Sequence, residues 1–318
     1  QEKLMILILR YPMVIAGFAC CFFMSCNNSG KDKKAYDTPG HGTINISVDE
    51  SFKPVIEEQI KMYEASFPDA KIIAHYKPEA ECFKDLWKDT VTRLIIVSRG
   101  LNDKEEDYFK NNMNYVPGWN IVALDAVVVL LNAKSNDSLF TLNRLKLQME
   151  GKINRHQKIV FDGVNATGTV RFILDSVLKG NKFDTTVVKA AKNSDEVIDY
   201  IAETPNAIGL VGFSHIGNPE DTAQVNKLKK VKMAYVQCTI CPDSPFVKPM
   251  QQSISSKHYP LVRGIYYIIN ETHLGLGTDF TGFLKFERGQ LIFRRAYLVP
   301  VMQFDVRAVK VNEKIPEN

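Results

Sequence analysis

The sequence predicts an α/β protein of two domains, joined by two crossover strands, with a ligand cleft between the domains. Segments with the two-residue alternation of strands and segments with helical spacing follow one another along most of the 318 residues. Two long apolar segments rich in β-branched residues, 121–132 and 261–269, stand at the boundaries of a middle α/β block. About 290 residues remain beyond the apolar N-terminal segment, enough for two hydrophobic cores.

The first part of the chain alternates regularly between the two periods. The predicted order is strand 43–48, helix 51–67, strand 71–75, helix 79–88, strand 93–98 and helix 103–113. Such an order favours a mainly parallel sheet whose two faces are covered by helices.

Segment 121–132, IVALDAVVVLLN, is too apolar for an edge strand and too β-branched to favour a helix, so we predict a long buried strand. A second α/β set follows, and segment 261–269, LVRGIYYII, predicts another long buried strand. The second set comprises helix 138–149, strand 158–161, helix 167–178, strand 185–189, helix 194–203, strand 207–211 and strand 229–236. Helices 279–286 and 288–296 and a strand 304–311 complete the expected elements.

The two long strands suggest that the chain leaves one domain and later returns to it. Domain I is then expected to comprise residues 43–130 and 260–318, and domain II residues 131–259. In such an architecture a ligand lies between the domains, against carboxyl ends of strands and N-termini of helices.

The N-terminal segment 1–26 has the character of an export signal, because a short apolar run ends at small residues and polar sequence follows at once. Ser25 directly before Cys26 resembles a bacterial lipobox, which implies cleavage before Cys26 and lipid attachment to its thiol. An uncleaved membrane anchor is the alternative. Residues 27–42 are expected to be a solvated tether.

Composition argues against several function classes. The formal net charge is +4 without a run of Lys or Arg, so nucleic acid is not an expected partner. Cys238 and Cys241 could form a local disulfide or half of a metal site, but a metal needs four donors and no second pair follows. No catalytic signature appears, so neither an enzyme nor a metal or other cofactor is expected.

The segment 161–174, FDGVNATGTVRFIL, carries the clearest binding motif. Thr167-Gly168-Thr169 opens a helix, where free backbone N–H groups and small hydroxyl side chains can bind an oxyanion. The alternative is that Asn165 or Thr167 serves only as a helix cap. The glycine spacing resembles a nucleotide-binding P-loop, but Val170 follows the Gly168-Thr169 pair and the lysine is absent, so we reject that alternative.

Several segments together resemble the phosphate-binding subunit of bacterial phosphate ABC transporters, a periplasmic solute-binding protein. The similarity runs in consistent order from about residue 43 to 302. The segments that carry it are GTINISVDESFKPVIEEQIKMYE, VSRGLNDKE, VALDAVVVLLN, NATGTVRFI, AIGLVGFS, YPLVRGIYYIIN and GFLKFERGQLIFRRAYLVPV. The resemblance implies a two-domain periplasmic-binding-protein fold of type II.

The resemblance also implies a ligand site of hydroxyls, backbone amides and one arginine. The residues that match it are Ser51, Phe52, Ser98, Arg99, Thr167, Gly168 and Thr169. Two departures stand out: the Gly/Ser-rich loop expected after the second strand is replaced by His75-Tyr76-Lys77-Pro78-Glu79, and Gly163 stands where an arginine is common.

Each charged neighbour has more than one interpretation. Arg99 could supply the positive charge of the site, or could pair with Glu105 or Glu106 in the following helix. Arg171 is expected at the surface or in a contact between domains, and Arg263 in a buried ion pair at the hinge. Asp49 and Glu50 would repel an anion, so we expect them to point away or to accept a proton of the ligand.

The function implied is capture of phosphate, or a similar oxyanion, and delivery to an ABC permease. The protein is expected to be a monomer on the periplasmic side of the cell envelope, held to the membrane by the lipid on Cys26. The alternative is a sensor or adhesive lipoprotein that keeps the fold without transport, which the altered loop 75–79 motivates. A hydrolase built on Cys82 or Cys241 and a histidine is a third, weaker hypothesis.

Overall fold

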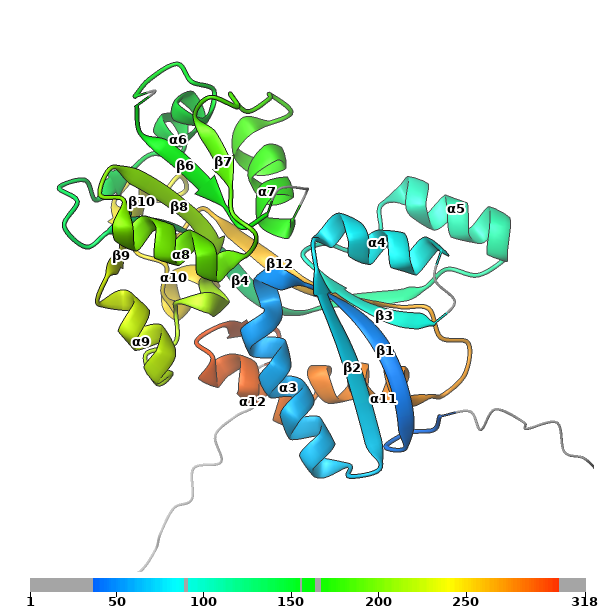
Figure 1. Ribbon diagram of the computed structural model, residues 1–318. Coiled ribbons are helices and arrows are strands. Elements are labelled where there is room, and N and C mark those ends of the chain that lie inside the picture. Colours follow the sequence, from blue (N-terminus) through cyan, green and yellow to red (C-terminus); the bar gives the residue numbers. More distant parts are fainter. Residues whose placement is uncertain (1–36, 89–90, 155, 164–166, 303–318) are drawn as a thin grey trace, which may run out of the picture. The chain divides into compact units, whose positions relative to one another are not determined.

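The computed structural model describes residues 37–88, 91–154, 156–163 and 167–302 (Figure 1). Its central element is β4 (Gly118–Asn132), a 15-residue strand. The first part of β4 pairs antiparallel with β12 (Val262–Ile269), and its second part pairs antiparallel with β8 (Ala207–Gly212). The sheet therefore has the order β2-β1-β3-β12-β4-β8-β6-β7, with two parallel groups of strands on either side of the β12–β4 pair.

The first parallel group contains β1, β2 and β3. Its elements are β1 (Gly42–Asp49), α3 (Lys53–Ser66), β2 (Ala70–Lys77), α4 (Glu79–Lys88), β3 (Thr92–Val97) and α5 (Asp103–Met113). Helix α3 begins with a proline in its first turn, where a missing N–H is harmless, and buries Val55, Ile56 and Tyr63. Helix α5 begins with a capping box between Asn102 and Glu105.

The second parallel group contains β6, β7 and β8. Its elements are α6 (Leu142–Met149), β6 (Lys158–Phe161), α7 (Gly168–Ile173), β7 (Val188–Ala190), α8 (Ser194–Glu203) and β8, followed by α9 (Thr222–Leu228) and β9 (Val231–Met233). Helix α7 continues into a π-helical turn at Leu174–Leu178. A small separate sheet combines β5 (Leu139–Phe140), β10 (Tyr235–Gln237) and β11 (Phe246–Val247).

The C-terminal part of the described chain returns to the first group. It consists of α10 (Gln251–Ser255), β12, α11 (Leu276–Lys285), α12 (Glu287–Arg295) and β13 (Val299–Pro300), which pairs with β4. Figure 1 shows the two groups of strands and helices at opposite ends of β4, with β12 running beside it. Side chains 127–131 of β4 are fully buried on both faces of the strand, which explains why the segment is apolar without alternation.

The structure confirms the α/β fold class and both long strands. The prediction of one strand at 229–236 was wrong, because the chain there forms β9 and β10 in two different sheets. Helix 138–149 was predicted too long, since β5 occupies its first turn. Helices α9 and α10 were missed, being short and largely polar. The predicted strand 304–311 lies outside the described residues.

The folded part begins earlier than expected. The tether was predicted to extend to residue 42, but Thr38 and His41 form a β-bridge, and Asp37 accepts hydrogen bonds from Arg93 and from the Leu276 amide. Cys238 and Cys241 form a disulfide, one of the two alternatives that the sequence left open.

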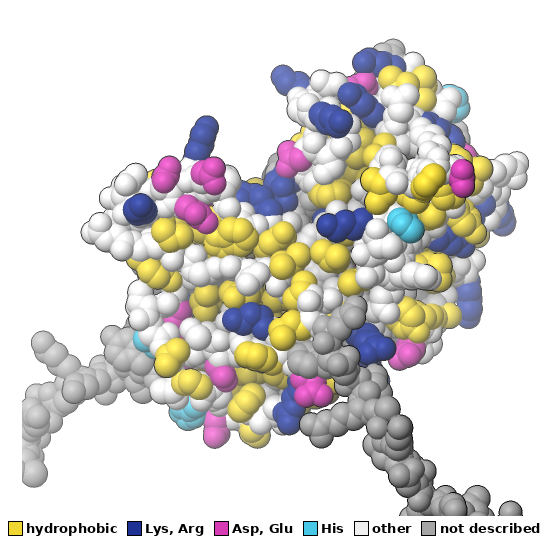
Figure 2. All heavy atoms as spheres, turned by 180° about the vertical axis from the view of Figure 1, so that it is seen from behind, with side chains coloured by type: hydrophobic (Ala, Val, Ile, Leu, Met, Phe, Trp, Pro, Cys, Tyr) yellow, Lys and Arg dark blue, Asp and Glu magenta, His cyan; other side chains and the backbone are white. Residues whose placement is uncertain are grey.

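Within the described part of the chain, no helix combines the length and the apolar character that a membrane crossing requires. Figure 2 shows one face of the molecule, on which Lys and Arg side chains are dispersed among apolar and acidic ones. This face therefore presents mixed charge rather than one basic surface.

Candidate functional site

Four segments of the chain meet at Gly168, the first residue of α7. The amide of Gly168 donates a hydrogen bond to Asp49 Oδ2 at 2.8 Å. A Cβ atom at this position would lie 2.2 Å from Asp49 Oδ2, 2.8 Å from Ser98 Oγ and 3.1 Å from Glu79 Oε2. Glycine is therefore required sterically, and the ends of β1 and β3 and the start of α4 all reach the start of α7.

Thr167 and Thr169 flank this glycine, and both side chains bind Asp162. The hydroxyl of Thr167 donates to Asp162 Oδ1 at 3.0 Å, and that of Thr169 donates to Asp162 Oδ2 at 2.8 Å. Thr167 Oγ1 also accepts from the Val170 amide, so Thr167 is the helix cap that the sequence left as an alternative. Asp162, which follows β6, was missed because its role depends on contacts that the local sequence does not specify.

Ser51 presents a buried hydroxyl to the same region. Its side chain is fully buried, and its Oγ has no hydrogen-bond partner among the described residues. Its amide donates to Asp49 Oδ1 at 3.1 Å, and its carbonyl accepts from Ser214 Oγ at 2.7 Å. Leaving a buried hydroxyl unpaired costs about 1–3 kcal/mol, so this atom is a candidate for contact with a bound molecule.

Phe52 is also fully buried, and its ring lies 4.7 Å from the guanidinium carbon of Arg263. Its side chain therefore supports that arginine.

Ser98 is held by a residue that the sequence did not identify, Glu79. The amide and the hydroxyl of Ser98 donate to Glu79 Oε2 at 2.7 and 2.5 Å. Arg171 binds both partners: its Nε donates to Glu79 Oε1, and its NH2 donates to Ser98 Oγ at 2.7 Å. The one available signal was the position of Glu79 in the loop that departs from the resemblance.

Arg99, the arginine predicted to bind the ligand, forms the alternative ion pair with Glu105. Its guanidinium donates to both carboxylate oxygens of Glu105, at 2.6 and 2.8 Å, and stacks 3.9 Å from the centre of the Phe83 ring. Arg171 instead contacts Glu79 and Ser98, and it links α7 to α4. The sequence predicted Arg171 at the surface or in a contact between domains.

Arg263 confirms the prediction of a buried ion pair. Its Nε and NH2 donate to Asp125 Oδ2 at 2.9 and 2.8 Å, and its NH1 donates to Thr169 Oγ1 at 3.2 Å. The two side chains lie on paired strands, β12 and β4, and are essentially inaccessible to solvent. The Arg263 guanidinium therefore places a positive charge next to the hydroxyl of Thr169.

The carboxyl groups around Gly168 are poorly solvated, and this changes their acidity. Burial, and then the charge of Glu79, raise the pKa of Asp49 to about 7. Burial, and then the charge of Asp162, raise the pKa of Glu50 to about 8, although Ser194 donates to it. Burial also raises the pKa of Asp162, against the opposing charge of Arg263. At neutral pH this region therefore holds protons that exposed carboxyl groups would have released.

Asp37, Glu271 and His273 form a separate group with metal-ligand chemistry, their ligand atoms all lying within 4.8 Å of one another. Arg93 already provides a cation there, with NH2 at 2.6 Å from Asp37 Oδ1 and NH1 at 3.1 Å from Glu271 Oε1. Burial raises the pKa of Asp37, but hydrogen bonds from the Leu276 amide and from Arg93 outweigh it and lower that pKa overall. The group joins the lead-in to β1 with the start of α11.

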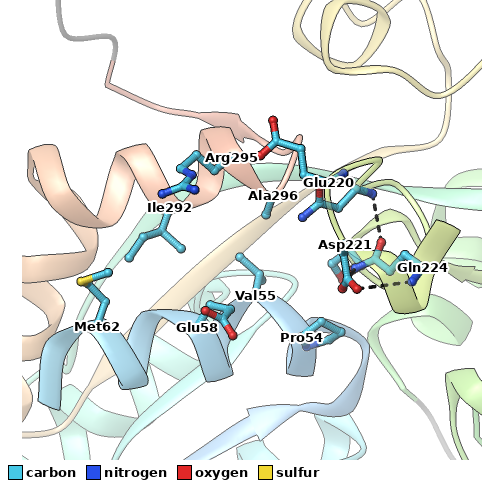
Figure 3. A pocket seen from close by; sticks show the side chains of 12 residues that line it. Pro54, Val55, Glu58, Met62, Glu220, Asp221, Gln224, Ile292, Arg295 and Ala296 are labelled. Atoms are coloured by element: carbon cyan, nitrogen blue, oxygen red, sulfur yellow. Dashed lines mark hydrogen bonds between the residues drawn. The ribbon is translucent and has the colours of Figure 1, made fainter. Parts of the chain in front are cut away.

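A groove of about 360 Å³ lies between α3, α9 and α12 (Figure 3). Met62 and Ile292 supply apolar walls, whereas Gln224 donates to Asp221 at 3.1 Å within the polar end. Ser214 both lines the groove and binds the Ser51 carbonyl, so the groove approaches the Gly168 site from another side.

The fold and the convergence of loops at Gly168 define a class, the two-domain α/β proteins of the periplasmic-binding type. A PBP superfamily domain matches residues 34–287, which is most of the chain. The chain belongs to the PBP superfamily.

Solved structures agree on the fold. A candidate phosphate ABC transporter substrate-binding protein with bound phosphate from Clostridium perfringens is 20% identical, with a TM-score of 0.67 over 82% of this chain and 100% of that one. An ABC-type phosphate transport receptor from Vibrio cholerae is 16% identical, with a TM-score of 0.59 over 81% of this chain and 100% of that one. No curated protein matches the sequence. At these identities the likeness establishes the fold alone.

Proposed function

We propose that the chain is an exported, lipid-anchored solute-binding protein that captures phosphate, or a similar oxyanion, and delivers it to an ABC permease. The observation that carries this proposal is the convergence of donors at Gly168. The Gly168 amide, the Ser98 amide and hydroxyl, and the Arg171 guanidinium all point to carboxylate oxygens there. Amides, hydroxyls and guanidinium groups are also the donors that phosphate requires. The similar proteins named for phosphate support the choice of ligand.

In this proposal domain I comprises residues 43–130 and 260–318, and domain II residues 131–259. Several contacts then cross the cleft, among them those of Gly168 with Asp49, Arg171 with Glu79, and Ser194 with Glu50. Ligand contacts from both sides favour the closed arrangement, and the hinge lies where β4 and β12 run between the domains. A permease can then distinguish the loaded protein by its shape.

The site residues have distinct proposed roles. Ser51, Ser98, Thr167 and Thr169 provide hydroxyl groups, Gly168 provides its amide, and Phe52 supports the arginine behind the site. Arg99 remains the predicted cation for the ligand, and it would have to leave Glu105 to reach it. Asp49 lies where it can accept a proton from a ligand that keeps one, in agreement with its raised pKa.

The proposed location of the protein rests on residues outside the described part. The apolar segment 1–26 and Cys26 support export and lipid attachment on the periplasmic side of the cell envelope. We propose a monomer that reaches its permease from this anchor.

Calorimetric titration of the full-length protein in detergent with inorganic phosphate tests the function. We expect saturable heat and a higher melting temperature at micromolar to millimolar phosphate, and a weaker response to sulfate. Absence of both effects at all phosphate concentrations would contradict the proposal.

A second candidate is a sensor or adhesive lipoprotein with a degenerate site. It is favoured by one observation, the Glu79 carboxylate bound to Ser98 and Arg171. A permease gene beside the gene for this chain would support transport, and its absence would support this candidate.

A further inference from the structure

Glu79 is bound by donors of the kinds that would also bind a ligand oxyanion. It is the first residue of α4 and is 1% exposed. One carboxylate oxygen accepts from the amide and the hydroxyl of Ser98, and the other accepts from Arg171. An amide, a hydroxyl and a guanidinium thus converge on a single buried anionic group.

Asp49 repeats this arrangement on the other side of Gly168. Its Oδ2 accepts from the Gly168 amide at 2.8 Å, and its Oδ1 accepts from the Ser51 amide at 3.1 Å. Asp49, Ser98 and Glu79 pack so closely around Gly168 that even a Cβ atom on this glycine would collide with them. The donors around Gly168 are therefore engaged by carboxylates of the chain itself.

We propose that Glu79 is an internal ligand that holds the oxyanion site in its unloaded state and must leave when the oxyanion binds. A carboxylate is an anion that presents two oxygens, as a phosphate group presents several, so it can engage the same donors. The proposal rests on the proposed function and adds a determinant of affinity to it. Arg171 stays in place and exchanges Glu79 for the bound anion.

The position of Glu79 allows such an exchange. Arg171 is partly exposed, its side chain being 26% accessible, and it also binds the exposed Asp175, so it remains paired when Glu79 leaves. Glu79 and Ala80 line a cavity of about 280 Å³ together with Phe83, Lys84, Trp87, Arg99 and Arg171. Rotation of Glu79 toward this cavity would place its carboxylate near Lys84 and Arg99 instead of leaving it buried alone.

Competition from a tethered group lowers apparent affinity strongly. A group held on the same chain acts at an effective concentration in the millimolar range or above, so removing it should tighten phosphate binding by about tenfold or more. Removing the negative charge also removes its repulsion of the entering anion. Both effects act on affinity in the same direction.

The test compares phosphate titration of the full-length protein in detergent with that of Glu79→Gln and Glu79→Ala. We expect both variants to bind inorganic phosphate about tenfold more tightly or better, with Glu79→Ala the tighter because it also opens space. Glu58→Gln is the matched control, since Glu58 is an exposed carboxylate in the groove of Figure 3, and it should leave affinity unchanged.

The outcomes separate this inference from the proposed function. Binding by the wild type with equal or weaker binding by both Glu79 variants overturns the inference and leaves the proposed function in place. Absence of binding by all the proteins overturns the proposed function, and the inference with it. Melting curves show whether each variant is folded, and the conservative Glu79→Gln keeps the comparison valid if Glu79→Ala does not fold.

Discussion

Two arginine–carboxylate pairs lie close to Gly168, and they differ in what they join. Arg263 and Asp125 are register partners on the adjacent strands β12 and β4, and their side chains are 1% and 0% exposed. Arg171 and Glu79 belong to different helices, α7 and α4, and the arginine is partly exposed. The first pair is fixed by the sheet, whereas the second depends on how two separate parts of the chain approach each other.

This difference has an energetic consequence. A buried pair on neighbouring strands cannot separate without leaving a charge in the core, so it persists whether or not a ligand is present. Where solvent reaches the arginine and the pair bridges separate elements, the arginine can exchange its partner at a smaller cost. The comparison therefore predicts effects on stability for Arg263 and effects on binding for Arg171.

The largest effect is expected from Arg263→Ala. Loss of the guanidinium leaves Asp125 buried without its partner, and the free energy of unfolding should fall by about 3–5 kcal/mol. Urea denaturation followed by circular dichroism measures this loss. The double variant Arg263→Leu with Asp125→Leu should recover most of it. If Arg263→Ala were as stable as the wild type, the Arg263–Asp125 pair would not be the structural pair proposed here.

Arg171→Ala should change binding more than stability. We expect phosphate affinity to fall about 10- to 100-fold, as for loss of a hydrogen bond to a charged group, while the free energy of unfolding falls by less than for Arg263→Ala, because the Ser98 amide and hydroxyl still donate to Glu79. Titration calorimetry and urea denaturation measure the two quantities. Arg144→Ala is the control, because the Arg144 side chain is about as exposed as that of Arg171 and pairs with Asp137 outside the site. A stability loss as large as that of Arg263→Ala would remove the distinction.

The carboxyl groups between the two pairs predict a dependence of stability on pH. The raised pKa values of Asp49, about 7, and Glu50, about 8, mean that the folded protein holds protons which the unfolded chain releases. This stabilisation is complete at low pH and is lost as pH rises through those values. Burial lowers the pKa of His215 to about 4, which acts in the opposite sense but mainly below pH 6.5.

Between pH 8.5 and 6.5 the phosphate-free protein should therefore become more stable by about 2 kcal/mol. Urea denaturation at several pH values in this window measures the change. The variant Asp49→Asn with Glu50→Gln should show a flatter profile, and an equally steep profile in that variant would assign the effect to other groups.

The smallest effect is expected outside both pairs, at the Cys238–Cys241 disulfide. The two cysteines are three residues apart in sequence, so the bond closes a short loop and should contribute about 2 kcal/mol or less. Cys238→Ser with Cys241→Ser should lower the urea midpoint slightly and leave phosphate affinity unchanged. A loss of phosphate affinity in this variant would show that the disulfide loop affects the ligand site.

Much of the fold could be predicted from local patterns. The helices at 79–88 and 103–113 were predicted at the bounds that α4 and α5 have, since helical spacing and polar caps mark them clearly. The two long strands were recognised because a strand buried on both faces has no polar alternation. Elements of two to five residues, such as β5, β11 and α10, were not separable, because such short segments contain hardly more than one period of their pattern.

The candidate site was predictable only in part. Ser98 and Gly168 were expected together, and the structure brings them to the same point. The arginine that reaches them is Arg171 rather than Arg99, and no local pattern distinguishes the two, because each has an acidic residue within reach along the chain. Glu79, Asp162 and Ser194 became visible only through contacts between residues far apart in sequence.

By itself the sequence determined the α/β class, the order of most elements, and the presence of a hydroxyl- and glycine-rich turn at the start of a helix. These features depend on residues a few positions apart, whose periodicity and capping chemistry act locally. The tertiary structure alone decided which carboxylate faces each donor at Gly168. That choice depends on the register of paired strands and on the approach of α4 to α7, which bring together residues 79, 98 and 168.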